Sequence, residues 1–400
     1  MINKQLFSFG GGQSQYNAFV RFNEFYVEAF RQLGCEVHYL STEFALTHRE
    51  ISNGFLFYFA HCNNEVLRNI YDAMPLLPVV NHFIDHPLDF LFPTQETEVF
   101  IPSQLPIVFD ISWIEFLERH KKQDSDPPQA ALYLPLAGFV HPEISHSNGQ
   151  PSCSQRKTEI LFAGSIVSPE SLRKNWYERV PFLAQAIDTV VEHTSQNNVN
   201  LLDIFLEQRL NPECVRDMNC ISTIFRYANE YTRTHYRLKL LRTLAQAGVP
   251  ATVYSNHPEL LNKLVGKHNF EVRPPVDFMD LLKLMAQSKM VLNCRPNTQG
   301  MTERVPSTML NGAVSINDTN TYLSQEFVDG QEAIFYDYQK LEELPDKIFH
   351  LLSHPDELDT IAMAGQRKAQ ERHTVLHRVQ TILDSVEQFR AMLLNAHHTQ

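Results

Sequence analysis

The chain has 400 residues, of which 43% are hydrophobic and 20% are charged, so it can bury two cores of ordinary size. Its formal net charge is −12, and no run of Lys or Arg reverses that sign locally, which excludes a general attraction to nucleic acid or anionic lipid. Any phosphate that the protein binds must therefore sit in a local pocket.

The N-terminus and the cysteines predict a cytoplasmic protein. Residues 1–9 run straight into glycines and lack the longer apolar core of a signal peptide. No later segment approaches the roughly 20 apolar residues that cross a bilayer, so no integral membrane segment is expected. The six cysteines have no CxxC spacing, which favours buried thiols in a reducing compartment over disulfides or a zinc site.

The first part of the chain reads as strand, glycine loop and helix. An apolar run at 5–9 is followed by three glycines and by an amphipathic stretch from about Tyr16 to Leu33, and a second strand follows at 36–40. Further short apolar runs lie at 55–60, 77–83, 105–109 and 131–136. Short buried strands with helices or loops between them are typical of an α/β domain with a mostly parallel sheet.

The second part repeats this pattern. Residues 146–157 belong to a stretch rich in Pro, Ser, Asn, Gly and Gln, which predicts an interdomain linker. A largely helical region from 172 to 247 then separates the first strand of a new series from the rest. The strands of this series are expected at 159–163, 251–254, 270–272, 290–293, 313–317 and 333–335. The order of elements predicts a second doubly wound half.

The predicted domains are therefore an N-terminal Rossmann-like domain at 1–145 and a C-terminal one at 158–375, with a helical insertion. Residues 356–400 read as two charged amphipathic helices. The part at 376–400 forms a C-terminal helix that can cross back to the N-terminal domain. Two such halves are expected to enclose a ligand cleft between the carboxyl ends of facing sheets.

The segment from 290 to 336 carries the most chemistry. A strand ends at Asn293, a polar loop follows, and Pro306 and Gly312 mark the start and end of a short helix. Backbone amides and hydroxyls at such a helix start would form a diphosphate site. The candidate donor-binding residues here are Arg295, Asn297, Glu303, Arg304, Ser307 and Thr308. An ordinary polar loop, with Glu303 and Arg304 as a structural ion pair, remains the alternative.

The same segment resembles the donor-binding region of CgeB-like glycosyltransferases, which are related to the group 1 enzymes of the GT-B fold. The features that carry the resemblance are Glu303-Arg304, Ser307, Leu310 to Ala313, Asp318, Tyr322-Leu323, Phe327, Asp329-Gly330 and Phe335-Tyr336. The larger group often has a glutamate in place of Ser307, which would contact the donor ribose. That contact is therefore unassigned, and Glu303 is its nearest substitute.

The resemblance implies an α/β protein of the GT-B fold, with two Rossmann-like domains facing each other across a cleft. It also implies sugar transfer from a nucleotide diphosphate sugar, with the donor held by the C-terminal half and the acceptor by the N-terminal half. Gly164 and Ser165 lie at a strand end where such enzymes approach the donor phosphates. Arg173 and Lys174 would offset the charge on the departing diphosphate, the work that a metal does in other transferases. A solvated Arg-Lys pair is an equally good interpretation.

The first glycine loop offers two further donor contacts, Gly11 and Gly12, because glycine lets the backbone approach a ligand closely. Contact with the acceptor, or a plain tight turn, are the alternatives. The loop is not a GxGxxG fingerprint, and no Walker A sequence occurs in the chain, so NAD(P) binding and P-loop ATP hydrolysis lose support.

Asp85 and His86 follow an apolar strand of the N-terminal half and are the candidate catalytic residues. An inverting transferase needs such a side chain to take the proton of the acceptor hydroxyl. His61 is the second choice, and a structural role is the alternative, since the chain has 18 histidines. None of them has HExxH spacing, so the sequence predicts no metal and no cofactor beyond the nucleotide sugar.

The leading hypothesis is metal-independent glycosyl transfer to an acceptor that is a protein, a glycan or a small molecule. A nucleotide-sugar epimerase of the same architecture and a non-catalytic nucleotide-sugar-binding protein are the alternatives. An epimerase needs no acceptor, which separates it from a transferase. The sequence does not identify the sugar, the nucleotide, the acceptor, the stereochemistry or the oligomeric state.

Overall fold

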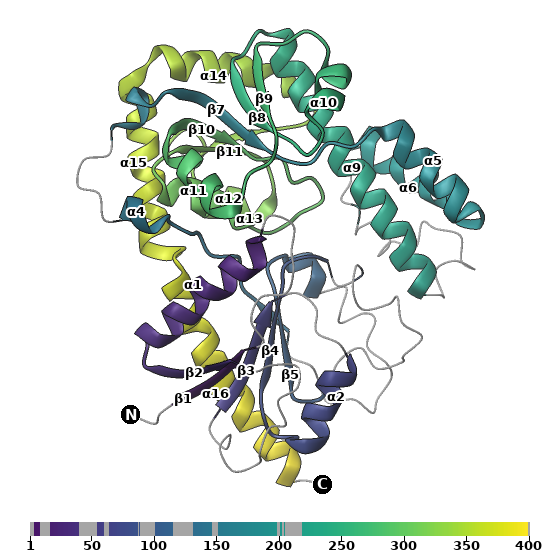
Figure 1. The fold of residues 1–400 in the computed structure, drawn as a ribbon, viewed down its shortest axis with the longest axis vertical. Coiled ribbons are helices and arrows are strands. Elements are labelled where there is room, and N and C mark those ends of the chain that lie inside the picture. The colour runs from purple at the N-terminus through teal and green to yellow at the C-terminus, as the bar shows by residue number, and fades with distance from the viewer. Residues whose placement is uncertain are drawn as a thin grey trace. The chain divides into compact units, whose positions relative to one another are not determined.

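The computed structural model describes residues 4–8, 17–39, 54–59, 64–86, 88, 101–114, 131–145, 151–197, 201, 204 and 218–398. The chain divides into two compact units (Figure 1). The N-terminal unit comprises Met1–Ala137 and His373–Gln400, and the C-terminal unit comprises Gly138–Arg372.

The N-terminal unit is built on a six-stranded parallel sheet in the order β2-β1-β3-β4-β5-β6. Its strands are β1 (Lys4–Ser8), β2 (Cys35–Tyr39), β3 (Gly54–Phe59), β4 (Val79–Phe83), β5 (Gln104–Val108) and β6 (Leu132–Tyr133). Every residue of β3, β4 and β5 is buried, as expected for central parallel strands that are covered on both faces. The short apolar runs of the sequence are these strands.

The helices α1 (Ala18–Gln32), α2 (Asn64–Ala73) and α16 (Val375–His398) accompany this sheet. The last helix packs along α1. Arg378 Nε donates a hydrogen bond of 2.6 Å to the carbonyl oxygen of Pro135, and Arg390 Nη2 donates one of 2.8 Å to that of Gly54. The C-terminal helix of the chain is thus part of the N-terminal unit.

The C-terminal unit holds a second six-stranded parallel sheet in the order β12-β11-β10-β7-β8-β9. Its strands are β7 (Thr158–Ala163), β8 (Ala251–Tyr254), β9 (Phe270–Arg273), β10 (Ser288–Leu292), β11 (Val314–Asp318) and β12 (Ile334–Tyr336). The chain moves outward from β7 in one direction through β8 and β9, and in the other through β10, β11 and β12. The predicted doubly wound arrangement is therefore confirmed, with its switch point between β7 and β10.

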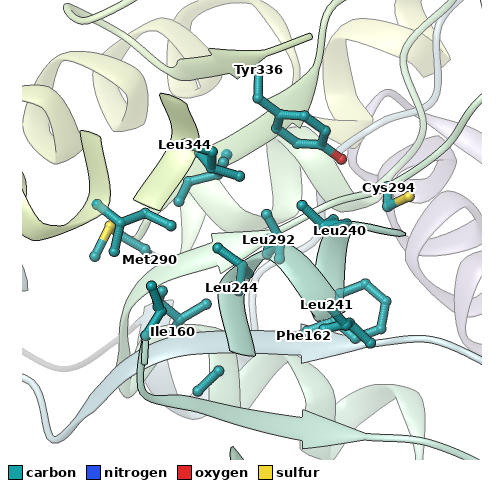
Figure 2. Packing of buried hydrophobic residues seen from close by; sticks show 14 of the residues in the cluster. Ile160, Phe162, Leu240, Leu241, Leu244, Met290, Leu292, Cys294, Tyr336 and Leu344 are labelled. Carbon is teal, nitrogen blue, oxygen red and sulfur yellow. The ribbon is translucent and has the colours of Figure 1, made fainter. Parts of the chain in front are cut away.

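The helical insertion of this unit ends in α9 (Met218–Gln246), the longest of the described helices. Further helices and 3-10 turns (η) of the unit are α4 (Pro142–Ser145), η3 (Cys153–Gln155), α5 (Pro169–Arg179), η4 (Pro181–Leu183), α6 (Ala184–Asn197), α10 (Pro258–Val265), α11 (Phe278–Ala286), α12 (Arg304–Leu310), α13 (Thr321–Glu326), η5 (Leu341–Glu343), α14 (Leu344–Ser353) and α15 (Pro355–Arg372). Figure 2 shows the core in which α9 packs on the sheet. Leu240, Leu241 and Leu244 of α9 meet Phe162 of β7 and Leu292 of β10 there.

Part of the predicted linker contributes to the C-terminal unit. Cys153 and Arg156 are buried at 5% and 6% exposure, and Arg156 Nη1 donates to the carbonyl oxygen of Ser288, 3.0 Å away. Ser154 is held by Asp359 of α15. Residues 151–157 therefore pack as part of the domain, whereas 146–150 lie outside the described residues.

Candidate functional site

The site is built where the C-terminal sheet changes direction. β7 and β10 are hydrogen-bonded neighbours, with Phe162 beside Leu292, so their carboxyl ends lie at the same edge of the sheet. The chain leaves these two strands through residues 163–165 and 293–295. Ligands of doubly wound proteins bind at the carboxyl ends of strands next to such a switch point. Gly164, Ser165 and Arg295, which the sequence predicts as donor contacts, thus lie at one edge.

Two arginines converge on the end of β7. Arg304 Nη1 donates a hydrogen bond of 2.5 Å to the carbonyl oxygen of Ala163, and Arg237 Nη1 donates one of 2.9 Å to that of Ser165. Both side chains are half-buried. Among the described residues, no Asp or Glu forms an ion pair with either arginine. The carbonyls position the guanidinium groups without neutralising them, and Glu303 acts on the charge of Arg304 without forming an ion pair within 4.0 Å.

The charge of Arg237 is disfavoured by its surroundings. Burial lowers its pKa to about 9, and the positive charges of Arg233, Arg304 and Arg295 act in the same direction. Burial also lowers the pKa of Arg304. Removing charge from water and placing it beside like charge costs free energy unless an anion compensates. The strand edge therefore has the electrostatics of a site for an anionic ligand.

A glycine makes room for this arrangement. A Cβ atom on Gly164 would lie 3.0 Å from Phe162 Cζ and 3.4 Å from Arg237 Cζ. The guanidinium group thus lies directly against the strand end. A larger side chain at this position would displace the ring of Phe162 or the guanidinium group of Arg237.

The carboxyl end of β11 adds an acid to the same edge. Asp318 is buried and accepts a hydrogen bond of 3.0 Å from the backbone N–H of Arg295. Burial raises the pKa of Asp318 to about 6 from a usual 3.8. The hydrogen bond fixes the loop after β10, and the raised pKa reduces the negative charge that Asp318 presents below about pH 6.

The start of helix α12 differs from the sequence prediction. The helix begins at Arg304 instead of Pro306, because a proline is tolerated at the third helical position, where no N–H bond is required. The N–H of Ser307 consequently donates to the carbonyl oxygen of Glu303, 3.0 Å away. The expectation that this N–H is an orphan donor was wrong.

The two hydroxyls of this helix have partners within the protein. Ser307 Oγ accepts a hydrogen bond of 3.0 Å from the N–H of Phe139, and Thr308 Oγ1 donates one of 2.8 Å to the carbonyl oxygen of Arg304. Both side chains are completely buried. Their hydroxyls hold α12 to the segment at Phe139 and to its own first turn, and the assignment of Ser307 and Thr308 to the donor stays a prediction.

Glu303 and Asn297 frame the loop before α12. Glu303 is half-buried and precedes the helix without capping it through its side chain. It forms no ion pair within 4.0 Å of Arg304 in the described structure, but while burial lowers the pKa of Arg304 the negative charge of Glu303 acts in the opposite direction, so the structural pairing of these two residues remains an alternative. Asn297 has a left-handed backbone with φ of 66°, and its Oδ1 accepts a hydrogen bond of 3.3 Å from the N–H of Leu201.

Arg173 and Lys174 lie on α5 and each has a carboxylate partner. Arg173 Nε is 3.0 Å from Asp188 Oδ1, and Lys174 Nζ is 3.6 Å from Glu178 Oε1. Their side chains are 51% and 73% exposed. Both cations are therefore neutralised in part on a solvated helix surface. This agrees with the alternative interpretation of the sequence, a solvated Arg-Lys pair.

The candidate acceptor bases lie after β4 in the N-terminal unit. Asp85 is half-buried, whereas His86 is buried, accepts a hydrogen bond from the N–H of Leu88 at Nδ1, and lies edge-on to Trp113. Burial lowers the pKa of His86 well below 6.5, so its ring is neutral at pH 7. Gly11, Gly12 and His61, also candidates, lie outside the described residues.

Comparison with known proteins identifies the domain that carries this edge. Residues 233–384 match the family model described as glycosyl transferase-like. This part of the chain is a glycosyltransferase domain. The match covers the second half of α9 with Arg237, the loop with Arg304, and the strands β8 to β12. The predicted resemblance to a CgeB-like glycosyltransferase family is confirmed over this part of the chain, and no curated protein matches the sequence.

Solved structures give this glycosyltransferase the GT-B fold. Anabaena HepE, solved with UDP and glucose, is 12% identical with a TM-score of 0.51, covering 96% of this chain and 100% of its own. The DNA-modifying β-glucosyltransferase is 13% identical with a TM-score of 0.54, covering 96% and 99%. Sucrose-phosphate synthase from Thermosynechococcus elongatus is 9% identical with a TM-score of 0.50, covering 98% and 100%. The predicted GT-B fold is confirmed.

The described part of the chain has neither a metal-binding cluster nor a membrane-spanning helix. No group of three or more His, Cys, Asp or Glu side chains there is arranged as for a metal ion. None of its helices in that part is long and apolar enough to cross a membrane.

Arg237 is the site residue that sequence reasoning missed. It lies in α9, far along the chain from the loop of Arg304, within a helix that otherwise packs on the core. A signal was present, because Arg233 and Arg237 are four residues apart and so lie on one helix face beside buried leucines. A cation on the buried side of a helix needs an explanation in a way that a surface cation does not.

Proposed function

We propose that the protein transfers a sugar from a nucleotide diphosphate sugar to an acceptor, and that it binds the donor diphosphate at the carboxyl ends of β7 and β10. The observation that carries this proposal is the convergence of Arg237 and Arg304 on the end of β7, where neither forms an ion pair with a carboxylate of the described residues. A diphosphate would supply negative charge to pair with these two guanidinium groups. Planar guanidinium groups also match phosphate oxygens in geometry.

The comparisons support a uridine nucleotide as the first donor to test. The structure of HepE contains UDP and glucose, and that of the DNA-modifying enzyme was determined with and without uridine diphosphoglucose. UDP-glucose is therefore the leading donor, with GDP- and dTDP-sugars as the other two. The arginines take over the role of a divalent cation at the diphosphate, so transfer should continue in EDTA.

Asp85 is the better of the two proposed acceptor bases. It follows the carboxyl end of β4 and its side chain is half-buried, so it retains access to solvent. His86 is buried, and its lowered pKa makes it a weak base. We therefore propose that Asp85 takes the proton of the acceptor hydroxyl, and that His86 has a supporting role beside it.

Calorimetry with UDP, GDP and dTDP, followed by nucleotide release from the matching sugar donors, tests the proposal. We expect binding of one diphosphate in the presence of EDTA, and release that speeds up when a suitable acceptor is added. If the protein binds neither UDP nor GDP nor dTDP, the proposal is wrong. Conversion of the sugar without an acceptor would identify an epimerase instead, and binding without turnover would identify a sensor.

A further inference from the structure

Tyr338 lies between two segments that bring arginines to the strand edge. It follows the end of β12 by two residues and is only 5% exposed. Its ring packs against that of Tyr236 in α9, with 4.2 Å between the ring centroids, and its carbonyl oxygen accepts a hydrogen bond of 2.6 Å from Lys239 Nζ. These two contacts lie on either side of Arg237 along α9. Tyr338 thus holds the part of the helix that carries this arginine.

The hydroxyl group of Tyr338 reaches the loop after β10. Its oxygen is 3.0 Å from Cys294 Sγ, in a hydrogen bond that either atom can donate. Cys294 is buried and directly precedes Arg295. A second tyrosine holds the residue before it, because Tyr336 Oη donates a hydrogen bond of 2.7 Å to the carbonyl oxygen of Asn293, and its hydroxyl group points toward Cys294 in Figure 2. The loop is therefore fixed at consecutive residues up to the arginine.

We infer that Tyr338 is a positioning residue for donor binding, which keeps Arg237 and Arg295 together at the strand edge. It acts through the neighbours of these arginines in the chain, on α9 and in the loop after β10, and it need not touch the donor. The assignment rests on the proposed function, because it concerns the same edge.

The two arginines need such a support because their charges repel each other. Burial is the main cause of the lowered pKa of Arg237, and the positive charge of Arg295 adds to it. Like charges repel more strongly where little water screens them. Without a bound anion, the segments that carry the two arginines are therefore pushed apart. A neutral side chain with contacts to both segments opposes that movement without adding charge.

The hydroxyl group of Tyr338 has a task that packing alone does not explain, since a phenylalanine ring would fill the same space. Burial raises the pKa of Asp318 to about 6, and the hydroxyl group of Tyr338 acts on that carboxyl group in the opposite direction. Asp318 Oδ1 in turn accepts the hydrogen bond from the backbone N–H of Arg295. The hydroxyl group thus reaches Arg295 by two routes, through the thiol of Cys294 and through this carboxyl group.

The test compares Tyr338→Phe with a matched control, Tyr58→Phe. Both variants keep the ring and lose one buried hydroxyl group, but Tyr58 belongs to β3 of the N-terminal unit, where its Oη accepts a hydrogen bond of 3.2 Å from Gln104 Nε2. Calorimetry measures the affinity for UDP, or for GDP or dTDP if wild type binds one of these instead, well below the melting temperature of each variant. Arg295→Gln, alone and combined with Tyr338→Phe, completes a double-mutant cycle.

We expect Tyr338→Phe to bind UDP about 3- to 10-fold more weakly, the effect of roughly one buried hydrogen bond, and Tyr58→Phe to bind it as wild type does. The melting temperatures of these two variants should fall by similar amounts. In the Arg295→Gln background, Tyr338→Phe should weaken UDP binding little further. The reason is that this background has neither the loop arginine nor its repulsion of Arg237.

Two results would overturn this assignment alone. Tyr338→Phe could bind UDP with wild-type affinity, or the losses caused by Tyr338→Phe and Arg295→Gln could add in full, and either result would leave Tyr338 a purely structural role. If wild type binds none of UDP, GDP and dTDP, the proposed function fails and this assignment fails with it. Nucleotide binding by wild type therefore separates the two failures.

Discussion

Two pairs of cations in the C-terminal unit have opposite environments. Arg173 and Lys174 are adjacent in sequence on α5, exposed to water, and paired with carboxylates. Arg237 and Arg304 are distant in sequence, half-buried, and bonded to backbone carbonyls at the end of β7. For the binding of an anionic ligand, we expect the partner of a cation to matter more than the place of that cation in a sequence motif. A carboxylate offsets the positive charge of the cation, whereas a backbone carbonyl orients the side chain without offsetting its charge.

The largest expected effect tests whether donor binding and proton transfer are separate tasks of the two units. Asp85→Ala should lower sugar transfer by roughly 10²- to 10⁴-fold, the usual contribution of a general base, while UDP affinity stays near wild type. Initial rates and calorimetry measure the two quantities, with His86→Ala alongside. Rates within a few-fold of wild type for both variants would move the base elsewhere, with His61 next. They would also suit a retaining mechanism, so product stereochemistry is determined in the same experiment.

The next largest expected effect concerns Asp318, at the carboxyl end of β11, and the free energy of unfolding. Burial raises the pKa of Asp318 to about 6, so the native state keeps a proton that the unfolded chain has released above its usual pKa of 3.8. Its stabilising contribution is complete below about pH 4 and is lost as the pH rises through 6. Asp318→Asn should therefore flatten the fall in unfolding free energy between pH 4 and 7, by at most about 3 kcal/mol.

Denaturant unfolding at four pH values between 4 and 7 measures this difference. Asp384→Asn is the control, because Asp384 is exposed on α16 and accepts a hydrogen bond only from Gln380 in the described structure. An Asp318→Asn profile parallel to that of wild type would show that this carboxyl group ionises as it does in water.

Arg304→Ala tests the charge that the strand edge offers to the donor. It should weaken UDP binding by about 1.5 to 3 kcal/mol, because a charged hydrogen bond to phosphate is lost, while the melting temperature changes little. Calorimetry and thermal unfolding measure the two. A variant that unfolds early, yet binds UDP with unaltered affinity once folded, would make Arg304 a structural residue that holds the end of β7.

The smallest expected effect concerns Arg173 and Lys174 of α5. Arg173→Ala should change the unfolding free energy by no more than about 1 kcal/mol, because an exposed ion pair contributes little. Lys174→Ala should do the same, and UDP affinity should stay within a few-fold of wild type for both. A tenfold loss of UDP affinity in either variant would reverse the comparison and return these cations to the donor site.

Local patterns were sufficient for the elements and for part of the site. The apolar runs at 55–60 and 105–109 are the buried strands β3 and β5, and the end of the predicted helical region at 247 matches the end of α9 at Gln246. Arg304 was found because its loop resembles a family motif. The start of α12 was misplaced because Pro306 suits several positions of a first helical turn.

The sequence by itself determined the two doubly wound halves, because periodicity and turn residues act over a few neighbouring positions. Only the tertiary structure decided which of these cations have a carboxylate partner among the described residues. Arg237 reaches the end of β7 because α9 packs its leucines on the sheet, and the guanidinium group of Arg173 pairs with Asp188 on a neighbouring helix. Both outcomes depend on contacts between segments far apart in the chain, which no local pattern records.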